Sequence, residues 1–393
     1  MGHSARCTAG YRAVRTVLRR ESPVHWCEPT GYRPFWAVTR HADIKAISSQ
    51  PERFANAPRT MLLAKQLEDQ GLTRGIRTLV SMDPPEHRGY RAIASSWFRP
   101  GTLRSIENSI RDTTRRLFDS LADRSGTFDF VTEFSSWLPL KVICSVLGAA
   151  EEDEALVLQI ANTAFGLEDP EFGPKMTELA PRMVAYYQRI MTDRQANPTD
   201  DLYSAIANAT IDGEPIGIIE LVSYLLIMTT AGHDTTRNAL TGGLLALIER
   251  PDQLARLQEN PRLAAVAADE IIRWTSPVIQ FCRTATEDSE VAGQPIKAGE
   301  NLSLFFPSGS RDENVFEDAD AFQVDRDPNP HLGFGFGEHY CLGASLARME
   351  IRIFLEEFLP RVRNIQLTGT PLRTAASFVG GVKHLPIQWE LNV

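Results

Sequence analysis

Residues 334–343 read Phe334-Gly335-Phe336-Gly337-Glu338-His339-Tyr340-Cys341-Leu342-Gly343. They place one cysteine in a glycine-rich loop, and apolar residues at helical spacing then predict a helix from Leu342 to Phe358. A cysteine just before a helix N-terminus faces free backbone N–H groups and the positive end of the helix dipole, which both favour the thiolate. Glycines let a large flat ligand lie close to the backbone. The loop therefore suits a thiolate ligand to a haem iron.

Two other interpretations of this loop fail. A dinucleotide-binding loop needs a third glycine and a preceding strand within a βαβ unit, whereas Gly335-x-Gly337 leads to Tyr340. A structural zinc site needs about four ligands at paired spacing, and Cys341 and His339 have no such partners nearby in the sequence. A buried structural cysteine in a glycine-rich turn remains as the alternative.

The pattern Phe-x-x-Gly-x-His-x-Cys-x-Gly resembles the haem-binding signature of the cytochrome P450 family and matches it at every fixed position. The resemblance spans nearly the whole chain and implies one P450 domain over residues 1–393. It implies a fold that is mainly α with a small β-rich lobe, and haem b between the long central helix and the helix that follows the cysteine loop. By this resemblance Cys341 is the ligand of the haem iron. The other residues implied to lie against the cofactor are Phe334, Gly335, Gly343 and Ala231.

Length and composition agree with this reading. The 393 residues are 43% hydrophobic and contain no linker, repeat or low-complexity tract, so we expect one large domain. The net charge of −9 argues against nucleic-acid binding. Five scattered cysteines favour a reducing cytoplasm over a disulfide framework. The N-terminus lacks the apolar region of a secretory signal, and the longest uncharged apolar run, 221–230, is too short to span a bilayer. The chain resembles the soluble bacterial class without a membrane anchor, and we expect a monomer.

Periodicity predicts a mostly helical chain. Helices are expected over 11–21, 42–49, 61–70, 84–98, 102–122, 151–164, 175–197, 215–249 and 262–274, with strand-like alternation at 36–39 and across 290–305. The segment 215–249 is the long central helix, about 50 Å at 1.5 Å per residue.

The central helix contains Ala231-Gly232-His233-Asp234-Thr235-Thr236, an acid and an alcohol beside a glycine in an apolar helix. Ser and Thr side chains can bond back to helix carbonyls, and glycine weakens the local ladder, so a local opening could hold a small ligand. The stretch resembles the oxygen-activation motif of the family. The resemblance implies that Thr235 hydrogen-bonds the activated oxygen and that Asp234 relays protons from solvent. A helix cap or solvated pair is the alternative, and His233 receives no role.

Two further groups resemble family positions. Glu270 and Arg273 lie at i and i+3 on one helix face, and with Arg326 they resemble a buried network that supports the cysteine loop. A surface ion pair is the usual alternative for this spacing. The haem propionates require donors or cations, and the resemblance implies four: His87, Arg91, Arg283 and His339. Ser308-Gly309-Ser310-Arg311-Asp312 departs from the common Ala-x-Asn-Arg-Asp, leaving Ser310 a hydrogen bond of shorter reach.

The implied activity is that of a haem-thiolate monooxygenase, which inserts one atom of O₂ by hydroxylation or epoxidation into a hydrophobic small molecule, a steroid or terpenoid. No flavin or iron–sulfur motif is present in the chain, so electrons would come from a separate ferredoxin and ferredoxin reductase. The implied substrate pocket comprises Tyr224, Met228, Ala231, Val278, Phe281, Phe378 and Val379.

Two alternatives remain open. One is a peroxide-driven haem-thiolate enzyme, although known examples lack the acid–alcohol pair. The other is a non-catalytic haem sensor or carrier, which needs no proton relay. The family resemblance implies that the helices carrying Arg88, Arg91, Arg99, Arg348 and Arg352 lie on the thiolate side of the haem, so we expect a positive patch there that would attract an acidic ferredoxin.

Overall fold

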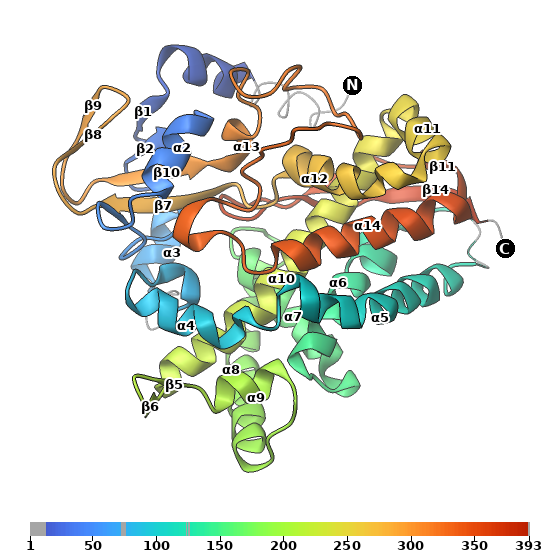
Figure 1. Cartoon of the computed structure of the whole chain (residues 1–393), viewed down its shortest axis with the longest axis horizontal. Coiled ribbons are helices and arrows are strands. Elements are labelled where there is room, and N and C mark those ends of the chain that lie inside the picture. The colour runs from blue at the N-terminus through green and yellow to red at the C-terminus, as the bar shows by residue number, and fades with distance from the viewer. Residues whose placement is uncertain (1–12, 72–75, 123, 125, 392–393) are drawn as a thin grey trace.

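The computed structural model describes residues 13–71, 76–122, 124 and 126–391. Helix α10, Ile218–Ile248, runs through the middle of the molecule for 31 residues, about 46 Å. Its most extensive helix contacts are with α6 (Trp137–Leu147), α7 (Glu154–Phe165), α12 (Ala264–Thr275) and α14 (Ala344–Arg361) (Figure 1). A helix that is apolar on nearly every side has to be buried, and most of α10 between Leu221 and Leu247 is.

The other helices surround this centre. They are α2 (His41–Ser48), α3 (Lys65–Asp69), α4 (Glu86–Ser95), α5 (Pro100–Asp119), α8 (Met176–Ala196), α9 (Leu202–Ala207), α11 (Pro251–Glu259) and α13 (Phe306–Gly309). Local sequence sets several of their ends. Both α5 and α11 begin with proline, which has no N–H to lose at a first helical position. Helix α6 ends at Gly148, whose φ of +78° is the left-handed conformation that glycine adopts most readily.

The strands form separate sheets: the largest lies on one side of the helices, β11 and β14 lie on the opposite side, and β5 and β6 lie apart from both (Figure 1). A five-stranded sheet has the order β1-β2-β10-β7-β3 and is antiparallel except between β2 and β10. Its members are β1 (Val24–Cys27), β2 (Phe35–Val38), β3 (Phe54–Ala55), β7 (Gln280–Ala285) and β10 (Asn301–Phe305). A three-stranded sheet, β11-β14-β4, comprises β4 (Phe128–Asp129), β11 (Val362–Leu367) and β14 (Pro386–Leu391). Three two-stranded pairs are β5 (Thr210–Ile211) with β6 (Glu214–Pro215), β8 (Ser289–Val291) with β9 (Gln294–Ile296), and β12 (Leu372–Arg373) with β13 (Val382–His384).

The expected fold class, mainly α with a small β-rich lobe, is confirmed. Periodicity located the long helices well, since α10 differs from the predicted 215–249 by only a few residues. The predicted helix over 61–70 shrinks to the five residues of α3, and residues 11 and 12 of the first predicted helix lie outside the described residues. Within the described ranges, no helix combines the length and apolar character needed to cross a bilayer.

Candidate active site

The cysteine loop is held by its own backbone. The Cys341 N–H donates to the Phe334 carbonyl at 2.9 Å, and Gly335 and Gly337 take positive φ angles of 70° and 76°. A Cβ on Gly337 would lie 2.2 Å from the Ser48 carbonyl oxygen, so only glycine allows this approach. The loop is thereby pressed onto the end of α2, and it presents the Cys341 sulfur to a cavity.

Burial raises the pKa of the Cys341 thiol, while a hydrogen bond from the Gly343 backbone and the charges of Arg91 and Arg348 oppose that rise. Burial is the largest of these effects. The backbone hydrogen bond from Gly343 acts in the direction expected for a helix N-terminus, but burial outweighs it in the protein by itself. A positive charge at the sulfur, such as a metal ion, would reverse the balance.

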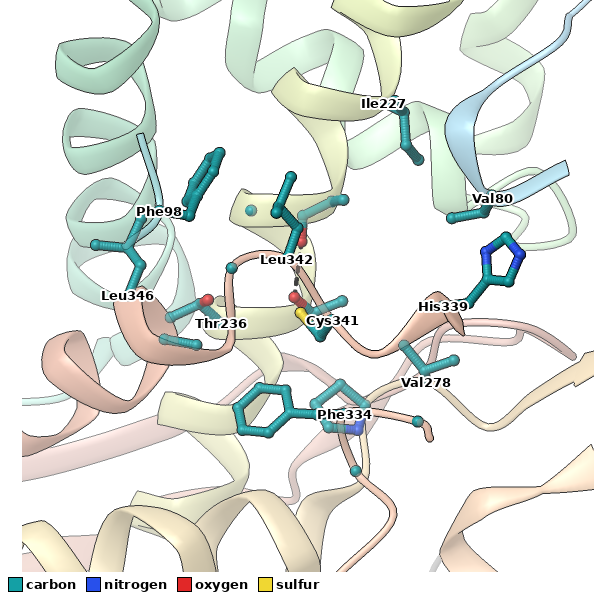
Figure 2. Close-up of a pocket in the computed structure, with 18 of the residues that line it drawn as sticks. Val80, Phe98, Ile227, Thr236, Val278, Phe334, His339, Cys341, Leu342 and Leu346 are labelled. Carbon is teal, nitrogen blue, oxygen red and sulfur yellow. Dashed lines mark hydrogen bonds between the residues drawn. The ribbon is translucent and has the colours of Figure 1, made fainter. Parts of the chain in front are cut away.

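The sulfur faces a cavity of about 210 Å³ between the cysteine loop and α10. Figure 2 shows Phe98 and Leu346 on one side of Cys341, Val278 and His339 on the other, and Phe334 below it. From α10 come Met228, Ala231, Gly232, Thr235, Thr236 and Ala239, and from the loop come Phe334, Gly335, Leu342 and Gly343. The walls are mainly apolar, with polar side chains at Ser48, Thr235, Thr236 and Glu350 and along one edge.

That edge carries donors and cations. His87, Arg91, Arg283 and His339 all line the cavity. His87 is fully buried, its ring lies 4.0 Å from that of His339, and neither of its ring nitrogens has a hydrogen-bond partner among the described residues. Burial lowers the pKa of His339 to about 2 and that of Arg283 to about 10. Desolvated donors without acceptors are costly, so this edge is built for an anionic ligand.

In α10 the Thr235 hydroxyl donates to the Ala231 carbonyl at 2.8 Å, which is the backward bond expected from the sequence. The Asp234 carboxylate is buried and lies 2.7 Å from an Arg237 Nη, and Arg237 donates to Asn162 at 2.6 Å. The solvated-pair alternative is therefore wrong. Burial raises the pKa of Asp234, and Arg237 opposes the rise.

His233, which received no role, is buried and is hydrogen-bonded through one ring nitrogen, whereas its Nδ1 has no hydrogen-bond partner among the described residues. Its Nε2 lies 3.0 Å from the Ser136 carbonyl oxygen, and burial lowers the pKa of its ring to about 3. It therefore stays neutral and ties α10 to the start of α6.

The network around Glu270 is buried, so the surface-pair alternative is also wrong. Arg273 makes two hydrogen bonds to the Glu270 carboxylate, at 2.6 and 2.8 Å, and the Arg326 Nε lies 3.2 Å from it. The remaining guanidinium donors bond to carbonyls between residues 310 and 321. Ser310 accepts from the Leu332 N–H at 3.0 Å, so the short side chain keeps its hydrogen bond. The network thus fixes the segment that leads into the cysteine loop.

A second cavity, of about 600 Å³, continues from the first. The two share Val80, Ile227, Ala231, Thr235, Val278 and Phe281. Three residues of the expected substrate pocket line only one cavity each: Met228 lines the first, and Phe378 and Val379 line the second. Tyr224 is a correction, because it lines neither cavity. It packs on Tyr90 and donates its hydroxyl to the Tyr90 carbonyl at 2.8 Å, which uses its only polar group.

The arginine patch is also corrected. Three of its five members are neutralised by acids of the same surface: Arg88 lies 2.8 Å from Glu338, Arg348 2.8 Å from Asp269, and Arg352 2.7 Å from Glu107. Arg91 faces the cavity and donates to the Tyr340 carbonyl. Among the described residues, Arg99 alone of the five has an exposed side chain with no ion-pair partner.

Comparison with known proteins decides the family. The sequence model of the family described as Cytochrome P450 matches residues 172–373. Cytochrome P450-terp from a Pseudomonas species is 38% identical, over 95% of this chain and 92% of the relative. The chain belongs to the cytochrome P450 family. A steroid C26-monooxygenase from Mycolicibacterium smegmatis is 34% identical over 95% of this P450 and 88% of the relative. The structure of Mycobacterium marinum cytochrome P450 CYP268A2 in complex with pseudoionone matches with a TM-score of 0.90 and 32% identity, over 99% of this chain and 95% of that one.

Cytochrome P450 proteins bind haem b and are monooxygenases. The residues of this P450 fit that cofactor. The cavity offers one sulfur, mainly apolar walls and, at one edge, Arg283 and the ring nitrogens of His87, which make no hydrogen bond among the described residues. Two propionates would supply the missing acceptors and charges.

Sequence reasoning missed several lining residues. Phe98, Val80 and Ile227 belong to no short motif, and only the folded chain brings them to the cavity. It also missed a group of charged residues that line the second cavity but not the first: Arg33, Arg59, Glu68 and Glu168. Loop residues of this kind carry no periodicity that could reveal them.

Proposed function

We propose that this P450 hydroxylates or epoxidises an apolar steroid or terpenoid, taking electrons from a ferredoxin and its reductase. The overall reaction consumes substrate, O₂, two electrons and two protons, and yields oxygenated product and water. The observation that supports the proposal best is the continuous cavity that joins the Cys341 sulfur and Thr235 to a larger apolar space. Relatives include the steroid C26-monooxygenase and a linalool 8-monooxygenase from Pseudomonas putida.

Each residue of the candidate site has a specific part in the proposed reaction. Cys341 would hold the iron, and His87, Arg91, Arg283 and His339 would hold the propionates. Bound haem supplies the redox chemistry that activates O₂. Thr235 places a hydroxyl donor at the cavity wall, and the buried Asp234 holds a proton acceptor one residue away. Val278, Phe281, Phe378 and Val379 would exclude water and orient the apolar substrate.

Asp234 and Thr235 favour this activity over the two alternatives, a peroxide-driven enzyme and a haem sensor or carrier. Neither alternative needs a buried acid beside an alcohol at the cavity wall.

Turnover assays distinguish the monooxygenase from the peroxide-driven enzyme and from the haem sensor or carrier. Haem-loaded protein would be given a surrogate ferredoxin, its reductase and NADPH with a panel of steroids and terpenoids, or hydrogen peroxide alone. We expect products with the ferredoxin system and a spectral shift of the ferric haem with the same compounds. Products with peroxide alone would indicate the peroxide-driven enzyme, and binding without product under either condition would indicate a sensor or carrier.

A further inference from the structure

The larger cavity has two chemically different ends. At the end shared with the cysteine cavity its walls are apolar, except for the hydroxyl of Thr235. At the other end the lining includes Arg33, Arg59, Glu68 and Glu168. A purely hydrocarbon substrate gains nothing from charges in its pocket, because they stay better solvated in water. The remote end is therefore the place to look for a recognised polar group.

Most of these charges are already engaged. Glu168 accepts from the Tyr32 hydroxyl and the Ala64 N–H, each at 3.0 Å, and from the Ser377 N–H at 2.7 Å. Glu68 accepts from the Arg33 Nε at 2.7 Å, and the same guanidinium reaches Asp69 at 3.0 Å.

Arg59 is different. Its Nε lies 3.5 Å from Oε1 of Glu68, and the other oxygen of that carboxylate, Oε2, accepts from the Arg33 Nε at 2.7 Å. The Arg59 guanidinium has five N–H donors, and no hydrogen bond within the described chain uses any of them.

The position of Arg59 is fixed. The next residue, Thr60, is buried, and its carbonyl accepts from the Cys282 N–H at 2.7 Å. Further along the loop, the Leu62 carbonyl accepts from the Ser377 hydroxyl at 2.9 Å. Because the backbone beside it is anchored, the Arg59 side chain starts from a fixed point on the cavity wall.

We propose that Arg59 anchors the substrate through a carboxylate at the end remote from the carbon that is oxidised. A guanidinium with free donors matches a carboxylate in charge and in its two-pronged geometry. The substrate would then be an elongated apolar acid, with the Arg59 end setting which carbon reaches Thr235. This inference rests on the proposed function, since it takes the cavity to be the substrate site.

The test measures binding rather than turnover. Farnesoic acid, its methyl ester and farnesene share one apolar skeleton and differ at one end. Their dissociation constants for haem-loaded protein would be measured by calorimetry and by the ferric spectral shift. We expect the acid to bind about 10- to 100-fold more tightly than farnesene, as for a charged hydrogen bond. Arg59→Met should remove the difference, and Arg59→Lys, which keeps the charge but not the fork, should keep part of it.

The matched control is Arg20→Gln. Arg20 is an exposed arginine paired with Glu313, and it lines neither cavity, so all three affinities should stay unchanged in that variant. Equal binding of acid and farnesene, or an acid preference that survives Arg59→Met, would overturn the proposal. Equal binding of acid and ester would replace the carboxylate with a neutral acceptor, which also overturns it. Tight acid binding without turnover would count against the monooxygenase proposal alone.

Discussion

At the scale of single residues, the site is defined by side chains whose chemistry is incomplete without a ligand. Burial disfavours the Cys341 thiolate, and neither buried ring nitrogen of His87 makes a hydrogen bond among the described residues, although Nδ1 lies 3.7 Å from Glu338. Both deficits lie on the walls of one cavity. A single group that carries a cation at its centre and anions at its edge would remove both.

The first prediction concerns Cys341, the residue proposed to bind the haem iron, and is tested by the variant Cys341→His. Thiolate ligation gives the ferrous–CO complex a strongly red-shifted Soret band, and we expect the variant to move that band to the position typical of imidazole ligation. Cys27→Ser is the control, because Cys27 lies in β1, away from the cavity. An unchanged spectrum in the Cys341 variant would remove the assigned ligand.

The second prediction concerns Thr235 and Asp234. The Thr235 hydroxyl is bound to the Ala231 carbonyl and has to leave it to serve a ligand in the cavity. Thr235→Ala should keep substrate affinity while diverting electrons to peroxide, and Asp234→Asn should slow turnover roughly 10²-fold. Thr229→Ala is matched, since Thr229 makes the same backward bond at 2.8 Å but lines neither cavity. Wild-type rate and coupling in both test variants would contradict the relay.

The third prediction concerns Arg237, the buried partner of Asp234. Arg237→Met leaves a buried carboxylate without its cation, and we expect a loss of about 3–5 kcal/mol in the free energy of unfolding at pH 7. Burial then raises the pKa of Asp234 in the folded state further above its unfolded value. The folded state therefore binds the extra proton, so stability falls as pH rises and the loss should shrink as pH is lowered.

Urea unfolding between pH 4 and 8 would measure this slope. In the double variant Arg237→Met/Asp234→Asn no carboxylate remains to titrate, so most of the pH dependence of the loss should disappear. A loss of equal size at every pH would show that Arg237 acts through packing alone.

At the scale of elements, the contact between α10 and α12 depends on glycine. A Cβ at Gly243 would lie 2.8–3.0 Å from the side-chain carbons of Ile271, and one at Gly242 would lie 2.6 Å from Thr275. Two helices can approach this closely only where a side chain is missing. The approach matters because α12 carries Glu270 and Arg273 and so links α10 to the support of the cysteine loop.

The fourth prediction follows from this contact. Alanine favours a helix over glycine by about 1 kcal/mol, yet Gly243→Ala should lower the free energy of unfolding by about 1–3 kcal/mol, because Ile271 cannot yield without repacking. Gly101→Ala in α5 is the matched control, since its nearest neighbour would be an Arg104 nitrogen at 3.8 Å. It should be neutral or stabilising, as seen by thermal unfolding. Stabilisation of both variants would contradict the close contact.

Prediction from sequence succeeded where a signal was local. The long amphipathic or apolar segments gave α8, α10 and α14 within a few residues, and the loop around Cys341 was identified by its fixed positions. Helix α6 was missed because Trp137–Leu147 is short and mostly apolar, so its pattern does not distinguish a helix from a buried strand. The residues of the site were harder to predict. Tyr224 packs outside both cavities and Arg59 lines the second one, and both placements depend on neighbours that are distant in the sequence.

At the scale of the whole molecule, the substrate cavity and the face that carries the cysteine loop lie in different parts of the structure. The substrate cavity lies toward the loop around Arg59 and the segment near Phe378, whereas α4, α5 and α14 lie together on the face that carries the cysteine loop (Figure 1). The net charge of −9 opposes an acidic partner anywhere except at a local patch. The internal ion pairs on that face make its positive field weaker than the arginine count suggests.

The fifth prediction therefore concerns Arg99, at the junction of α4 and α5. It is exposed, and it follows Phe98, which lines the first cavity, beside Cys341. If a ferredoxin docks on this face, Arg99 can offer its donors without breaking an existing pair. Arg99→Gln should raise the apparent KM for ferredoxin by up to about fivefold, as for a surface ion pair, leave kcat and substrate affinity unchanged, and flatten the dependence on ionic strength. Arg189→Gln removes the same charge from α8 and should do much less. Equal effects of the two variants would mean that only net charge matters and that docking occurs elsewhere.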